Sequence, residues 1–506
     1  MSILKKINVG ANLVPPVHPE LFDSGRGIDA RSQLRAQAAA ERCRDGPLAT
    51  QLLAPRDRHA RLRMHNVRLN RPGRWEAEQV RPAAIDLFCG AGGASLGLMR
   101  AGWDIRVASD SDQRCSLTHT ANLPVRFLEA DVRKTSADSL LDAAGLHPGE
   151  LDLLFAGPPC QGFSIIGSRV VWDERNNLFR EVLRLARDIR PRCVVIENVP
   201  GLVTLAKGAY LHAILEGLQA EGYEAACAEL LAAQYGAPQM RWRLIIIGWR
   251  KDLGIPAGYG FPPPAVGTAE IGELLPNCTI PAWQMKGFVT TAEAISDLPP
   301  VEAGEEESHY LGPPVGPFQT AMRAGLNGEL TNHYAARLSL VNLARLSLIK
   351  PGQDWRDLPR EMLPGSMQRA LRKDHTRRYR RMTWDGVPRA VITRFRDPKS
   401  GEYTHPDQNR TITIREAARL QGFPDRFVFH GDKSSQYDQV GNAVPVQLAE
   451  AIAAEIRRCL DGQLGDRLWA PFRRRPVPFL GTYGELVPGL PGLSTLMASG
   501  RAELES

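Results

Sequence analysis

The sequence predicts an α/β fold with a mainly parallel sheet, followed by a smaller, irregular domain. Between residues 83 and 248, short apolar runs alternate with segments that carry apolar residues at helical spacing, a pattern typical of β-α-β units. After Lys251 this periodicity weakens, and prolines punctuate a loop-rich stretch that extends to about Arg410. A chain of 506 residues is long enough for two or three domains of about 100 to 200 residues each.

Five apolar runs are the expected strands, and three segments between them have the apolar spacing of helices. The strands are Ala84 to Phe88, Ile105 to Ser109, Leu151 to Ala156, Cys193 to Glu197 and Leu244 to Gly248. The helices are Gly93 to Arg100, Asn177 to Arg187 and Tyr210 to Glu221. Because parallel strands end at the same edge of a sheet, the loops that follow them should meet there and form a ligand-binding crevice.

Two more helices are expected after the irregular stretch. Thr413 is a suitable N-cap for a helix over Ile414 to Gln421, and Glu416, three residues later, completes a capping box. The second helix should run from Val446 to Leu460.

The positive charge is concentrated at the N-terminal end. The formal net charge is +7, and residues 1–81 hold 15 Lys or Arg against 8 Asp or Glu, so they account for the whole excess. A basic segment of this kind suits contact with phosphates, but a solvated tail has the same composition, and both interpretations remain open.

The cysteines and the apolar runs exclude other classes of protein. The 8 cysteines include no C-x-x-C pair and no His at a zinc-site spacing, so no metal site is expected. No signal peptide is recognisable near Met1, and the apolar runs are far shorter than the roughly 20 residues that a membrane helix needs. We therefore expect a protein of a reducing, soluble compartment without membrane contact.

The first expected strand leads into a glycine-rich turn, D-L-F-C-G-A-G-G over residues 86–93, which opens a helix. Glycines let a ligand approach the backbone, and Asp110, about 20 residues after Gly90, is placed to accept both ribose hydroxyls. A nucleoside cofactor is implied, although a plain tight turn or a dinucleotide site remains open. The dinucleotide fingerprint has a third glycine where this chain has Ser95, and this difference favours adenosylmethionine.

A cysteine follows the strand Leu151 to Ala156, in the run G-P-P-C-Q-G-F-S over residues 157–164. This position places Cys160 in the expected crevice. A free cysteine is only a few per cent thiolate at neutral pH, so a nucleophile there needs nearby positive charge, backbone donors or its substrate. A buried core cysteine is the alternative, which suits Cys115 and Cys193 better than a cysteine in a Pro-Gly loop.

Two more segments are expected at the same edge of the sheet. Glu197 is the last residue of the expected strand Cys193 to Glu197. A stretch with Gln239, Arg241 and Arg243 leads into the last expected strand. A salt bridge at a strand end or a solvated edge would explain each segment alone. Together with Cys160, they place a nucleophile, a carboxyl group and a guanidinium in one crevice.

These strings resemble the motifs of the bacterial DNA cytosine-5 methyltransferases, in the order of that family. They are D-L-F-x-G-x-G-G from Asp86, G-P-P-C-Q-G-F-S from Gly157, E-N-V from Glu197, Q-x-R-x-R from Gln239, R-E-A-A-R-L-Q-G-F-P from Arg415 and Q-V-G-N-A-V-P from Gln439. The resemblance implies a sheet of the S-adenosylmethionine-dependent methyltransferase (Rossmann-like) type with a smaller, irregular target-recognition domain.

The resemblance also implies how the chain is divided. The parts are a basic N-terminal extension (1–81), a catalytic and cofactor-binding domain (82–250), a target-recognition region (251–410), the C-terminal part of the catalytic domain (411–460) and a tail of unknown role (461–506).

Roles for the site residues follow from the same resemblance. Cys160 is the expected nucleophile for ring carbon 6 of cytosine, Glu197 the group that engages ring nitrogen 3 and the amino group, and Arg243 a contact to the ring carbonyl. Arg241 belongs to the same catalytic set. The expected contacts of S-adenosyl-L-methionine are Phe88, Gly90, Gly92, Gly93, Asp110, Asp131, Pro158, Asn442 and Val444.

The recognition region is expected to hold DNA. Its arginines Arg377, Arg378, Arg380 and Arg381 suit phosphate contacts, although a solvated basic face would have the same composition. Many relatives have T-I-T-T where this chain has A-V-I-T over residues 390–393, so only Thr393 keeps its hydroxyl for a DNA contact.

The implied activity is transfer of a methyl group to carbon 5 of a flipped-out cytosine in a specific duplex sequence. Such an enzyme works as a monomer on double-stranded DNA in the bacterial cytoplasm, at the nucleoid. It protects host DNA in a restriction-modification system, whose endonuclease acts separately.

Three other functions fit the sequence less well. A transfer RNA cytosine-5 methyltransferase would carry a Cys-Phe-Thr motif in the recognition region, and this chain has none. A catalytically silent DNA-binding relative would be expected to lack Cys160, Glu197 or the glycine turn, and all are present. An NAD-dependent oxidoreductase would not explain Cys160 together with Glu197 and Arg243.

Overall fold

The structure is a computed structural model that describes residues 81–159, 178–263, 265–266, 287–326, 329–369, 377–464 and 481–482. Cys160 therefore lies outside the described residues. So do nearly all of the expected N-terminal extension and most of the expected tail.

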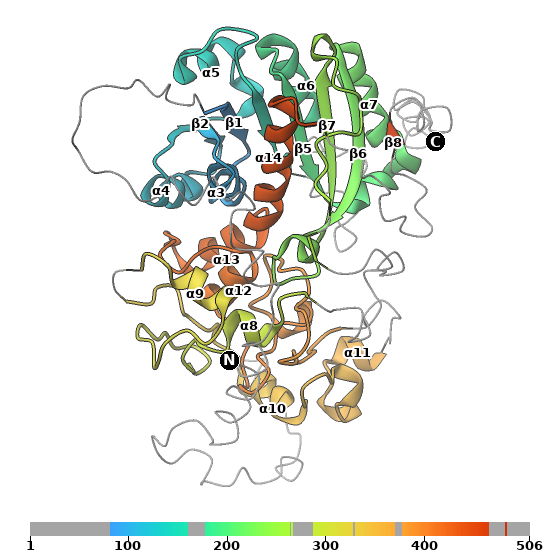
Figure 1. Cartoon of the computed structure of the whole chain (residues 1–506). Coiled ribbons are helices and arrows are strands. Elements are labelled where there is room, and N and C mark those ends of the chain that lie inside the picture. The colour runs from blue at the N-terminus through green and yellow to red at the C-terminus, as the bar shows by residue number, and fades with distance from the viewer. Residues whose placement is uncertain are drawn as a thin grey trace, which may run out of the picture.

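A single sheet forms the centre of the first domain, with the strand order β3-β2-β1-β4-β5-β7-β6-β8 (Figure 1). The strands are β1 (Ala83–Leu87), β2 (Asp104–Asp110), β3 (Arg126–Glu129), β4 (Leu153–Ala156), β5 (Cys193–Asn198), β6 (Tyr223–Leu231), β7 (Trp242–Arg250) and β8 (Gly481–Thr482). The first five strands of this order pair in parallel. The others are antiparallel, so β7 begins at the edge where β4 and β5 end.

Helices cover both faces of the sheet. They are α3 (Gly93–Arg100), α4 (Gln113–Asn122), α5 (Ala137–Ala144), α6 (Leu178–Ile189), α7 (Ala209–Ala220) and α14 (Val446–Leu460). The apolar faces of α5, α6 and α7 pack in one core with β1, β4 and β5. On the opposite face, α3 and α14 pack in a second core with the same sheet. The C-terminal helix α14 therefore completes the first domain, and the Nε1 of Trp103 donates to the carbonyl of Ala453 on α14 over 3.0 Å.

A second group of helices lies beside the sheet (Figure 1). It contains α8 (Thr291–Ile295), α9 (Pro317–Arg323), α10 (Leu340–Leu348), α11 (Gly365–Arg369), α12 (Ile414–Leu420) and α13 (Lys433–Asn442). Its buried apolar residues form two further clusters, one with α8, α9, α12 and α13 and one with α10 and α11. The capping box predicted for α12 is confirmed: the Thr413 hydroxyl accepts from the Glu416 N–H at 3.0 Å, and the Glu416 carboxylate accepts from the Thr413 N–H at 2.7 Å.

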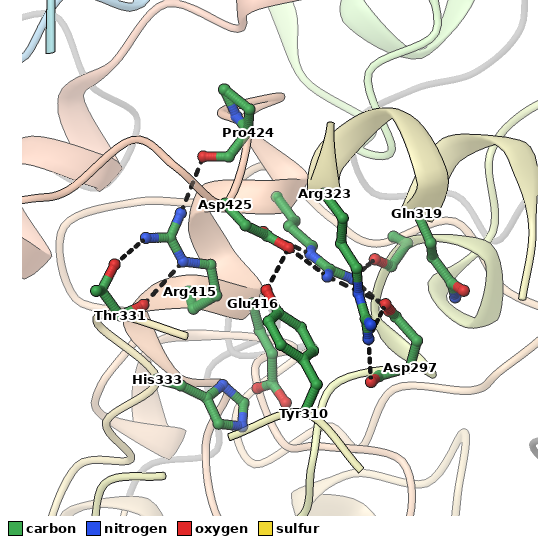
Figure 2. A network of polar contacts seen from close by, with 12 residues as sticks. Asp297, Tyr310, Gln319, Arg323, Thr331, His333, Arg415, Glu416, Pro424 and Asp425 are labelled. Atoms are coloured by element: carbon green, nitrogen blue, oxygen red, sulfur yellow. Dashed lines mark hydrogen bonds and ion pairs between the residues drawn. The ribbon is translucent and has the colours of Figure 1, made fainter. Parts of the chain in front are cut away.

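Buried ion pairs tie α12 to a preceding loop and to the turn that follows it (Figure 2). Arg419 pairs with Asp297 and with Asp425, and its side chain is fully buried. Tyr310 donates to Asp425 over 2.7 Å, and Arg323 pairs with Asp297 over 2.6 Å. Because a buried charge is tolerated only when it is paired and hydrogen-bonded, loss of either partner of Arg419 would leave an uncompensated charge inside this domain.

Within the described ranges, no helix is long and apolar enough to cross a membrane. Nor does any group of three or more His, Cys, Asp or Glu side chains in these ranges have the arrangement to hold a metal ion.

Candidate active site

The turn after β1 is crowded on one side and open on the other. Phe88, Gly90 and Gly92 all have positive φ, at 58°, 53° and 101°. A Cβ atom on Gly92 would lie 2.9 Å from the His119 ring, and one on Gly93 would lie 2.4 Å from the Val444 carbonyl oxygen. A Cβ on Gly90 would meet nothing within 4 Å. A left-handed Phe is strained, and such strain gathers at ligand sites, so the open side of this turn suits a ligand.

Asp110 is the last residue of β2, and its side chain is hydrogen-bonded to the glycine turn after β1. Its two carboxylate oxygens accept from the backbone N–H groups of Gly90 and Asp112, each at 2.9 Å. Burial raises the pKa of Asp110, and these two N–H groups act in the opposite direction. Each oxygen keeps one lone pair for a further donor, which is the requirement for binding the two hydroxyls of a ribose.

Of the other expected cofactor residues, Val444 contacts this turn directly, and Asn442 and Asp131 are described by their own surroundings. The Val444 carbonyl packs directly against Gly93. Asn442 is exposed at the end of α13. Asp131 follows β3, and its carboxylate accepts from the Arg133 guanidinium at 2.6 Å, which lowers the pKa of Asp131.

Glu197 and Arg243 meet at the edge of the sheet. Glu197 lies near the end of β5 and Arg243 near the start of β7, and the Nε of Arg243 is 2.5 Å from the Glu197 carboxylate. A Cβ on Gly157 would lie 3.7 Å from the same carboxylate, and the Asn198 amide donates to the Pro158 carbonyl over 3.4 Å. The loop that leads to Cys160 therefore begins beside this ion pair.

Arg241 is not part of this group, which corrects the expectation that it is catalytic. Its side chain is 4% exposed and donates to the carbonyls of Val391, Gly441 and Ala443. Side chains two positions apart point to the same face only within an extended strand. Because β7 begins at Trp242, Arg241 lies before the strand and need not point to the same side as Arg243.

Arg381 is also unsuited to the expected role, because it is buried and all of its donors are used. Its five N–H groups donate to the carbonyls of Ile349, Leu346, His405 and Gln408 and to the side chain of Asn409. Burial lowers the pKa of Arg381 to about 10. The expectation that Arg381 holds a phosphate is therefore wrong.

The remaining DNA-contact candidates lie in the second domain. Arg377 and Arg378 are partly exposed, and both have interactions within the protein. Arg380 pairs with Glu402 over 3.2 Å and with Asp354 over 3.8 Å. The backbone at Thr393 packs on Gly441, where a Cβ would lie 2.3 Å from the Thr393 nitrogen.

Sequence reasoning missed one polar group beneath the glycine turn. The Ser95 hydroxyl lies 2.6 Å from the Asp86 carboxylate and 3.1 Å from the Nε2 of His119. The only sequence signal was Ser95 itself, at a position where dinucleotide-binding turns have glycine.

A mainly parallel sheet, an open glycine turn after β1 and an acid at the end of β2 agree with the fold of an adenosylmethionine-dependent methyltransferase. The model of the C-5 cytosine-specific DNA methylase family matches residues 83–458. The chain belongs to this family. It is a DNA (cytosine-5-)-methyltransferase, and its methyl donor is S-adenosyl-L-methionine.

Individual relatives agree with this assignment. The chain is 34% identical to the Type II methyltransferase M1.HphI of Haemophilus parahaemolyticus, over 74% of this chain and 86% of that protein. It is 30% identical to the Type II methyltransferase M.AgeI of Thalassovita gelatinovora, over 74% of this chain and 98% of that protein. Among solved structures, a candidate DNA modification methyltransferase from an E. coli prophage is 26% identical, with a TM-score of 0.54, over 75% of this chain and 99% of that chain.

Proposed function

We propose that this enzyme methylates carbon 5 of a cytosine flipped out of a specific duplex sequence, through a covalent adduct with Cys160. The observation that carries the proposal is the Glu197–Arg243 pair at the sheet edge, beside the loop that leads to Cys160. Extrusion of the base is required because carbons 5 and 6 are inaccessible in the base stack.

Each side chain of this pair has a task that the chemistry requires. Carbon 5 of cytosine is a poor nucleophile until the Cys160 thiolate adds to carbon 6 and generates an enamine. Glu197 would hold a proton at nitrogen 3, which stabilises the charge that develops in the ring. Arg243 both orients Glu197 and offers N–H groups to the ring carbonyl. Loss of the carbon 5 proton and elimination of Cys160 then restore the aromatic ring.

The turn between β1 and α3 fits S-adenosyl-L-methionine. The open space at Gly90 and the unused lone pairs of Asp110 suit the methionine and ribose portions. When bound, the cofactor supplies the methyl group that carbon 5 accepts. We propose that the other contacts are Phe88, Gly92, Gly93, Asp131, Pro158, Asn442 and Val444.

The biological role proposed here is the protection of host DNA. The relatives named as Type II methyltransferases support it. In this role the enzyme acts as a monomer on nucleoid DNA in the bacterial cytoplasm, and a partner endonuclease acts separately.

Bisulfite sequencing of DNA from cells that express the chain tests the substrate and the target together. We expect protected cytosines at one short sequence, and none in cells that express the Cys160→Ser variant. If DNA stayed unprotected while the purified chain methylated transfer RNA, the DNA assignment would be withdrawn.

A further inference from the structure

Three consecutive residues directly before β7 bind one segment of the second domain. The Met240 N–H donates to the Pro388 carbonyl over 2.7 Å, and the two segments pair in parallel at this point. The Gln239 side chain accepts from the Val391 N–H at 3.1 Å, and the Arg241 guanidinium donates to the Val391 carbonyl. Side chains of the catalytic domain therefore hold the backbone of Val391 on both its N–H and its carbonyl side.

The Gln239 amide is buried and makes three hydrogen bonds. Its side chain is 0% exposed. Its nitrogen donates to the Leu420 carbonyl over 2.6 Å and to the Gln421 side chain over 2.7 Å. Gln421 in turn donates to the Val440 carbonyl in α13 over 2.7 Å. Gln239 therefore joins the start of β7 to the end of α12, to the segment at Val391 and, through Gln421, to α13.

The segment over residues 388–393, called here the clamped segment, is also confined by α13. A Cβ on Gly441 would lie 2.3 Å from the Thr393 nitrogen, so glycine is required for this close approach. Val391 is 0% exposed and belongs to the apolar cluster that contains α12 and α13. A buried donor or acceptor that loses its partner is costly. The clamped segment is therefore fixed relative to the start of β7.

The run that holds the clamped segment also carries the arginine of the candidate active site. Arg243 follows Arg241 by two residues and pairs with Glu197 at the edge of the sheet. The residue between them, Trp242, packs in one apolar cluster with Met240. A displacement of the clamped segment would therefore reach the Glu197–Arg243 pair through a single intervening residue.

We propose that Gln239 is a positioning residue that couples recognition of the target sequence to the Glu197–Arg243 pair. The proposal rests on the proposed function, in which the second domain reads the DNA sequence. In this role Gln239 acts through the clamped segment and takes no part in bond making. Contacts of a correct sequence with the second domain stabilise the transition state only while the clamp holds that domain in position against the catalytic edge.

Single-turnover methylation by the full chain tests the proposal. Two duplexes are compared: one with the target sequence that bisulfite sequencing identifies, and one with a single recognition base pair changed outside the target cytosine. In Gln239→Leu, the rate on the target should fall about tenfold, the order expected when buried amide hydrogen bonds are lost. The rate on the changed duplex should fall much less, because that duplex already lacks a contact that the clamp would transmit.

Binding of the two duplexes provides the second readout. The clamped segment keeps its own residues in Gln239→Leu, so the ratio of the two dissociation constants should stay as in the wild type while the ratio of the two rates falls. A merely structural role would not separate these ratios. A fall in the ratio of dissociation constants alone would mean that Gln239 only shapes the DNA-contacting surface, and this result would contradict the proposal.

Gln319→Leu is the matched control. Gln319 is 1% exposed, and its amide also makes three hydrogen bonds. It accepts from the Val315 N–H at 2.8 Å and donates to the Ala292 carbonyl and the Ser296 hydroxyl, each over 3.0 Å. All three partners lie in the second domain. This variant should therefore lower stability towards urea but leave the ratio of the two rates unchanged.

Gln239→Asn is a milder second variant that carries the test if the leucine variant does not fold. Its shorter amide cannot reach Val391 and α12 at once, so the ratio of the two rates should fall by a smaller factor. An unchanged ratio in the folded Gln239 variants, or an equal fall in Gln319→Leu, would overturn the proposal. If the wild type did not methylate DNA or did not distinguish the two duplexes, the proposed function itself would fail, and this proposal with it.

Discussion

Arg241 and Arg243 are two positions apart in one motif and have opposite surroundings. Arg243 pairs with Glu197 at the open edge of the sheet, whereas Arg241 is buried among three backbone carbonyls from two segments. The sequence could predict that both are important, but it could not distinguish their roles. The distinction depends on where β7 begins and on which carbonyls the second domain brings near.

Substituting lysine for each arginine separates these roles. Arg241→Lys cannot reach several carbonyls at once, so the free energy of unfolding should fall by about 2 kcal/mol. Arg243→Lys keeps a charge for Glu197 but loses the planar fork, so turnover should fall by roughly a hundredfold. Urea unfolding and single-turnover methylation measure the two effects. Full activity in Arg243→Lys would remove it from the catalytic set.

Asp86 should destabilise the ligand-free protein as pH rises. Its pKa in the folded protein is about 7, against an ordinary value of 3.8, because of burial. A group with a raised folded-state pKa favours folding below the unfolded pKa, and this contribution is lost as pH rises through the folded value. The free energy of unfolding of Asp86→Asn should therefore exceed that of the wild type by about 2 to 4 kcal/mol above neutral pH. Near pH 4 the two proteins should differ little. A difference that does not change with pH would mean that Asp86 stays neutral.

Helices and strands could be predicted from the sequence to different extents. The range of α14 was predicted without error, and α3 likewise, because their apolar spacing and flanking residues agree. Three of the described strands were missed, including the two-residue β8. β3 has only four residues, R-F-L-E, and β6 is rich in alanine and glutamate, which favour helices. The antiparallel direction of β7 depends on long-range pairing, which no local pattern shows.

The segment from Arg377 to Arg381 contains arginines with different roles. We predict that Arg377→Gln with Arg378→Gln lowers the slope of log affinity against log salt by roughly two, and leaves the target sequence unchanged. Arg381→Gln is the matched control, because Arg381 is buried and fully hydrogen-bonded. It should lower stability and leave the slope unchanged. A slope that responds to Arg381 rather than to the other pair would contradict this division.

The whole molecule brings together segments that are far apart in the chain. Val444 packs on Gly93, α14 packs on α3, and Arg241 bonds to the junction of α13 and α14. In the order of the chain, the second domain therefore lies between two parts of one catalytic unit. Its interior contains the buried ion pairs of Arg419. The family motifs could predict which residues lie together at the site. They could not predict that Arg241 joins the two parts of the catalytic unit or that Arg381 is buried within the second domain, because burial arises from packing between segments.

Covalent trapping tests the central claim most directly. Duplex DNA with fluorine at carbon 5 of the target cytosine should be methylated once and then remain attached to Cys160, because elimination requires a proton at carbon 5. Cys160→Ser should abolish both trapping and turnover. Cys89→Ser should retain both, since Cys89 is buried and burial raises the pKa of its thiol. Mass spectrometry after denaturation should find the adduct on Cys160; a denaturation-resistant complex in Cys160→Ser, or its loss in Cys89→Ser, would contradict the account.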